Sequence, residues 1–73
     1  MAMVKFTNTG QFADMPIYLN IDHITSVFEV PTDEGSLRTH VYSAFGKDTN
    51  VWVVQESLGQ VIKAINKAEK VAP

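Results

Sequence analysis

The chain has 73 residues, no cysteine and a formal net charge of −2. A chain of this length forms one domain, residues 1–73, that buries only about 60% of the surface exposed by its unfolded form. Neither disulfides nor thiolate metal sites can add stability, so we expect self-association into a homo-oligomer. The mildly acidic charge disfavours a polyanion as an obligatory partner.

The chain shows no sign of membrane insertion or secretion. No apolar run approaches the ~20 residues of a membrane-spanning helix. Residues 1–5 lack the basic segment and long apolar core of a secretory signal. We therefore expect a cytoplasmic protein with no membrane partner.

The first half of the chain predicts three short strands. Each has alternating or β-branched and aromatic residues, and each is bounded by turn-forming residues. In the third strand, Val27 interrupts the alternation of its neighbours. Either a β-bulge or burial on both faces explains this interruption. The three predicted strands are residues 3–7, 17–21 and 24–30.

Two further strands follow, at residues 37–45 and 51–55. The loop at residues 31–36 contains proline, aspartate and glycine, as expected of a hairpin connection, and residues 46–50 form a second turn. Consecutive hairpins imply an antiparallel meander, because parallel neighbours need a long crossover.

An amphipathic helix follows the last strand. Ser57 is a suitable N-cap, and Gln60 stands at the capping-box position. Gly59 weakens a helix, and we interpret it as permitting close packing on the sheet. Apolar residues then recur at helical spacing, predicting a buried stripe of Leu58, Val61, Ile62 and Ile65, widened by Ala64 and Ala68.

These elements predict an α+β fold, with an antiparallel meander sheet of about five short strands and one C-terminal amphipathic helix packed on it. The apolar face of each strand should supply the core. The predicted core residues of the sheet are Val4, Phe6, Ile17, Leu19, Ile24, Phe28, Val41 and Phe45.

The sequence gives little support for catalysis. Its two histidines, His23 and His40, have no HxH, HxxxH or HExxH spacing, so we expect no metal site. Ser57 beside Glu56 could be a nucleophile with a base, but the N-cap role already uses the serine oxygen. The four glycines are isolated from one another and form no phosphate-binding loop. We expect neither a cofactor nor an enzymatic activity.

The second face of the fourth strand is a candidate interaction face. Arg38, His40 and Tyr42 alternate onto it, and either Trp52 with Val54 or Val51 with Val53 shares it. If Trp52 does, the candidate face is Arg38, His40, Tyr42 and Trp52. Such aromatic platforms suit a protein interface or base stacking. Burial under the helix or in an oligomer is favoured over nucleic acid because the chain is acidic.

The helix carries a second candidate surface. Lys63, Lys67 and Lys70 share one face through spacings of four and three. With Arg38 they predict, as an alternative function, weak nucleic-acid binding with salt-sensitive phosphate contacts. A solvated face that suits the negative helix end is the more common explanation.

Two segments resemble small flagellar and swarming-motility proteins of the FlbD type. Residues 20–27 (NIDHITSV) are similar to that family's N-x-D-x-I-x-x-I segment, and residues 53–62 (VVQESLGQVI) to its V-V-x-E-S-x-x-x-V-I strand-to-helix junction. The loop at residues 11–16 and the longer hairpin before Leu37 depart from the pattern. The resemblance implies a layout of strands followed by a helix, a bacterial cytoplasmic setting and a protein-binding or regulatory role, without any catalytic residue.

Residues and resemblance together predict a non-enzymatic interaction module. We expect it to be homo-oligomeric and to bind another protein in a regulatory or assembly role.

Overall fold

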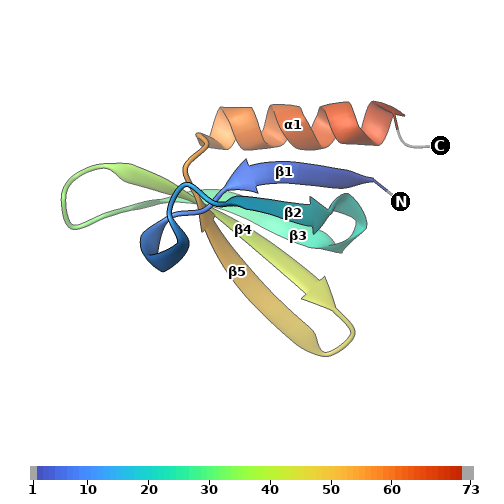
Figure 1. Cartoon of the computed structure of the whole chain (residues 1–73), viewed down its shortest axis with the longest axis horizontal. Helices are drawn as coiled ribbons and strands as arrows, with labels where there is room; N and C mark the ends of the chain where they lie inside the picture. The colour runs from blue at the N-terminus through green and yellow to red at the C-terminus, as the bar shows by residue number, and fades with distance from the viewer. Residues whose placement is uncertain (1, 72–73) are drawn as a thin grey trace.

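The computed structural model describes residues 2–71 and has five strands followed by one C-terminal α-helix (Figure 1). The predicted α+β class is therefore confirmed. In chain order the elements are β1 (Met3–Thr7), the 3-10 helix η1 (Gly10–Phe12), β2 (Pro16–Asn20), the 3-10 helix η2 (Ile21–His23), β3 (Ile24–Pro31), β4 (Leu37–Phe45), β5 (Asp48–Val54) and α1 (Leu58–Val71). Neither α1 nor the 3-10 turns are long and apolar enough to span a bilayer, within the part of the chain that the structure describes.

The strands belong to two antiparallel sheets rather than one. β1 pairs with β2, while β3, β4 and β5 form a three-stranded sheet in that order. The sheets meet at one corner. There Asn8 and Val54 form an isolated antiparallel β-bridge, and the backbone N–H of Gln55 donates to the Thr7 carbonyl at 2.9 Å. After this corner the chain turns away through η1, so β1 does not continue along β5.

The core lies between α1 and the two sheets. In Figure 1, α1 runs alongside β1, and the three-stranded sheet extends away beneath them. Every strand except β3 contributes at least one of the buried apolar side chains, and α1 contributes one. They are Val4, Phe6, Leu19, Val41, Val54 and Val61.

A β-bulge changes which side of β3 faces the core. The register with β4 shifts between Ile24 and Ser26, so that Ile24 and Val27 both pack against the core. Phe28 then points to the opposite face and is 41% exposed. The prediction that Phe28 is a core residue is wrong, because one inserted residue reverses the side-chain alternation.

The prediction that Phe45 is a core residue is also wrong, because its side chain is 70% exposed. Phe45 is the last residue of β4 and pairs with Asp48 beside the hairpin turn. Its ring packs against His23, with 4.8 Å between ring centroids. Phe45 is thus too near the hairpin end to reach the core.

The turn before β5 is shorter than expected. Phe45 pairs with Asp48, so that only Gly46 and Lys47 form the loop, and β5 begins three residues earlier than predicted. Gly46 has φ of 62°, which suits the first central position of a tight hairpin turn. β2 likewise ends at Asn20, one residue before the predicted end.

The start of α1 has the predicted capping box. The backbone N–H of Gln60 donates to Ser57 Oγ at 3.2 Å, and the backbone N–H of Ser57 donates to Gln60 Oε1 at 2.9 Å. Gly59, in contrast, does not contact the sheet, since a Cβ built there would meet no atom within 4 Å. The close-packing interpretation of Gly59 is wrong, because this position faces away from buried Val61.

Candidate functional site

The three-stranded sheet exposes an aromatic and apolar surface on the side away from the helix. Strand register places Phe28 opposite His40, His40 opposite Val53, and Tyr42 opposite Val51. Opposed residues project from the same face of a sheet. We call these five residues, Phe28, His40, Tyr42, Val51 and Val53, the outer face.

Aromatic rings form the centre of the outer face. The Phe28 ring stacks on Tyr42, with centroids 5.2 Å apart and planes at 17°, and on His40, with centroids 5.9 Å apart and planes at 27°. Val51 beside them is 46% exposed. The core, α1 and the β1–β2 pair lie on the other side of the sheet, the side of Val41 and Val54. Within residues 2–71, therefore, neither α1 nor the β1–β2 pair covers the outer face.

Trp52 does not belong to this surface. It pairs with Val41 and packs against the core, and its Nε1 donates to Ser43 Oγ at 3.0 Å. The predicted face of Arg38, His40, Tyr42 and Trp52 is therefore divided between two sides of the sheet. The two-residue turn decides this, because a register one residue different would have exposed Trp52.

The aromatic neighbour of Tyr42 on the outer face is Phe28 of β3, not Trp52 of β5 as predicted. Sequence reasoning missed it because the simple alternation of β3 put Phe28 inside. The available signal was Val27, whose position already indicated either a bulge or burial on both faces.

Arg38 lies at one end of the sheet, opposite Val30. It lines a polar hollow with residues of the β3–β4 loop, including Asp33 and Glu34. Two carboxylates beside this guanidinium reduce its value for binding a polyanion.

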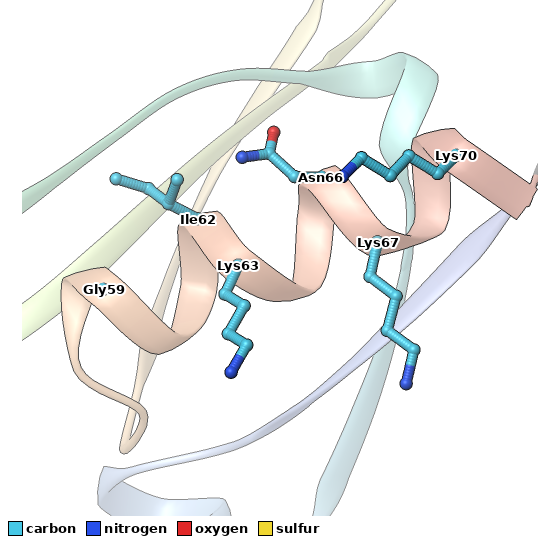
Figure 2. Close-up of a pocket in the computed structure, with 6 residues that line it drawn as sticks. All are labelled: Gly59, Ile62, Lys63, Asn66, Lys67 and Lys70. Carbon is cyan, nitrogen blue, oxygen red and sulfur yellow. The ribbon is translucent and has the colours of Figure 1, made fainter.

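The lysines of α1 surround a different, shallow hollow of about 500 Å³ on the outer side of the helix. Figure 2 shows Lys63 and Lys67 pointing to one side of the helix and Ile62 and Asn66 to the other, with the Lys70 side chain extending along the helix toward Asn66. The prediction that Ile62 is buried is wrong. Its side chain is 42% exposed, because it lies at the edge of the buried stripe. We call the six residues of this hollow the helix stripe: Gly59, Ile62, Lys63, Asn66, Lys67 and Lys70.

The structure does not bring Arg38 together with the lysines, since they line separate hollows. The lysines and Arg38 therefore do not form the single nucleic-acid surface that the sequence predicts. Weak nucleic-acid binding remains a prediction that rests on the lysines alone.

The groups considered for catalysis have structural partners. Both carboxylate oxygens of Glu56 accept hydrogen bonds from Thr7, one from its amide and one from its hydroxyl, each at 2.9 Å. Ser57 caps α1. His23 packs on Phe45, and His40 on Phe28. Between residues 2 and 71, no three side chains of metal-binding type lie close enough to share an ion.

Comparisons of the chain with protein-family models, with curated proteins and with solved structures give no match. The resemblance to FlbD-type proteins therefore stays a prediction.

Proposed function

We propose that this protein is a non-enzymatic interaction module that self-associates through the outer face and binds another protein in a regulatory or assembly role. The observation that carries the proposal is the aromatic stack of exposed Phe28 with half-buried His40 and Tyr42 on the sheet face opposite the core. A regulatory role in the cytoplasm of a bacterium agrees with what the FlbD-type resemblance implies.

The composition of the outer face supports a protein partner. Interface centres are rich in aromatic residues and poor in charge. The outer face has three ring side chains and two valines, and none of its members is acidic. An exposed apolar cluster of this kind on so small a domain is characteristic of an interaction site.

The size of the outer face sets the expected strength of self-association. The whole side of the sheet on which it lies, three strands spaced ~4.8 Å apart and about eight residues long, presents roughly 400 Å², which is an upper bound for the outer face. A stable interface of standard size buries about 800 Å² on each partner. Two copies packed face to face, as sheets pack in a sandwich, should therefore form a weak dimer that depends on concentration.

Tyr42→Glu tests this proposal, because the new charge would meet its own copy at the centre of a symmetric interface. We expect the mass of the unmodified protein to rise with concentration in light scattering or sedimentation. Tyr42→Glu should need at least about tenfold more protein for the same rise, which is an added cost of about 1.4 kcal/mol or more.

Tyr18→Glu is the control on the other sheet, since Tyr18 is also a strand tyrosine but lies on β2 and is exposed, whereas Tyr42 is half-buried. It should associate as the unmodified protein does, with the same circular dichroism spectrum. A monomer at every concentration, or equal association of Tyr42→Glu, would contradict the proposal.

A further inference from the structure

The charges of this chain are unevenly divided. Residues 1–57 carry three basic and seven acidic side chains, whereas α1 carries three basic side chains and one acidic one. All three lysines of α1 belong to the helix stripe, and Glu69 does not line its hollow. The molecule therefore has one localised basic surface on an otherwise acidic domain.

The helix stripe points directly away from the core. Val61, Ala64 and Ile65 pack inward, and the stripe residues occupy the opposite side of the helix by their 3.6-residue spacing. Along its length, one edge offers the exposed side chain of Ile62 and the other offers Lys63 and Lys67 (Figure 2). The surface is thus amphipathic, with an apolar contact beside a row of cations.

Gly59 gives the stripe a feature that helix formation alone does not explain. Glycine weakens a helix relative to alanine, and no neighbouring atom within 4 Å requires its small size. Its missing side chain instead leaves open the end of the hollow one turn before Ile62 and Lys63. A bulky residue at this position would fill that space.

We propose that the helix stripe binds an acidic amphipathic helical segment of another protein. Lys63, Lys67 and Lys70 would pair with carboxylates spaced four and three residues apart, and Ile62 with an apolar residue in the hollow beside Gly59. The inference names the partner chemistry for the proposed interaction module, but it does not depend on self-association through the outer face.

Charge and length favour this occupant over a polyanion. Lys63 and Lys70 are separated by only about 10 Å along the helix, and the remainder of the domain is acidic. A nucleic acid that continued beyond the stripe would meet like charge, whereas a short acidic helix ends within it. A membrane surface fits poorly, because the apolar face that would enter lipid is packed against the sheets.

The probe is a synthetic helical peptide with glutamates spaced to match the three lysines and leucine at the position facing Ile62. Titrated into the isotope-labelled protein, it should shift the amide resonances of the helix stripe and leave those of the outer face unchanged. Lys63→Glu with Lys67→Glu should weaken the affinity at least about tenfold, and moderate salt should weaken it further. Gly59→Leu should weaken binding too, whereas Gly59→Ala should not.

Three controls separate this site from the alternatives. Lys47→Glu reverses one lysine in the β4–β5 turn, outside the helix stripe, and should leave peptide affinity unchanged, as should Tyr42→Glu on the outer face. A peptide with glutamine for glutamate should bind at least about tenfold more weakly. A single-stranded oligonucleotide and anionic vesicles should bind more weakly than the acidic peptide.

Several results would overturn the inference. These are no shift at the helix stripe, an unchanged affinity after the double charge reversal, or tighter binding of the oligonucleotide or vesicles. Loss of self-association in the Lys63→Glu, Lys67→Glu variant would assign the stripe to contacts between copies instead. Failure of the outer-face test with intact peptide binding would remove only the self-association proposal.

Discussion

Glu56 connects three segments of the chain through two different groups. Its carboxylate accepts hydrogen bonds from the backbone N–H and the hydroxyl of Thr7 at the end of β1. Its backbone carbonyl accepts a hydrogen bond of 2.7 Å from the hydroxyl of Thr39. Thr39 belongs to β4 and is only 2% exposed. A motif-based interpretation considers Glu56 only as a possible base for Ser57, because its true partner is 49 residues away.

Glu56→Ala should lower the free energy of unfolding by about 1–3 kcal/mol, because it leaves the partly buried Thr7 groups without their acceptor. Urea unfolding followed by Trp52 fluorescence measures the change. Glu69→Ala, on the exposed side of α1, removes the same side chain without a buried partner and should stay within about 0.5 kcal/mol. Equal effects of the two variants would contradict the role assigned to Glu56.

At the scale of elements, two glycines with equally open surroundings should respond in opposite ways to alanine. A methyl group added at either Gly59 or Gly46 would meet no atom within 4 Å. Gly59 lies in the first turn of α1, whereas Gly46 has φ of 62° in the β4–β5 turn. The backbone conformation, not available space, distinguishes them.

Gly59→Ala should raise the free energy of unfolding by up to about 1 kcal/mol, because alanine favours the helix and restricts the unfolded chain. Gly46→Ala should lower it by about 1 kcal/mol, because alanine is strained at positive φ. Urea midpoints of both variants, measured side by side, check the pair. A destabilised Gly59→Ala would show that this position has a packing role.

At the scale of the whole molecule, the domain depends on a small core shared by both sheets and α1. Val61 is fully buried and belongs to one cluster with residues of β1, β2, β4 and β5. A domain of this length has a total stability of roughly 4–11 kcal/mol. The loss of a single core contact therefore affects all elements together.

Val61→Ala should lower the free energy of unfolding by about 2 kcal/mol, through lost apolar burial and the cavity that remains. Trp52 fluorescence and far-ultraviolet circular dichroism should report the same transition, because α1 cannot detach without exposing the core. Ile62→Ala, at a half-exposed neighbouring position, should cost less than half as much. Separate transitions for helix and sheet would contradict a single shared core.

Self-association acts on stability at this same scale. If two copies bind through the outer face, a more concentrated sample gains stability by mass action. The stability variants above are therefore best compared at one low protein concentration, at which the monomer dominates.

Most of the elements were predictable from local patterns. The bounds of β1 and β4 agree with the expected strands at 3–7 and 37–45, and the capping box starts α1 where Ser57 indicated. These features depend on alternation, turn residues and hydrogen bonds between residues at most a few positions apart. Short-range patterns of this kind are present in the amino-acid order itself.

The residues of the outer face, in contrast, depend on the strand register, which is fixed only in the folded chain. One bulge in β3 turns Phe28 to the outer face, and one two-residue turn directs the partly buried Trp52 to the core side, so that Phe28 and Tyr42 form the aromatic surface instead of Tyr42 and Trp52. A strand has a period of two, so a register change of one residue moves every side chain to the opposite face. Local patterns thus specify that these strands and the helix exist and that Val61, Ala64 and Ile65 face inward, although not that Ile62 is exposed, while pairing between strands selects which aromatic rings lie on the outer face. The physical reason is that alternation leaves two nearly equivalent registers, and only contacts between distant strands distinguish them.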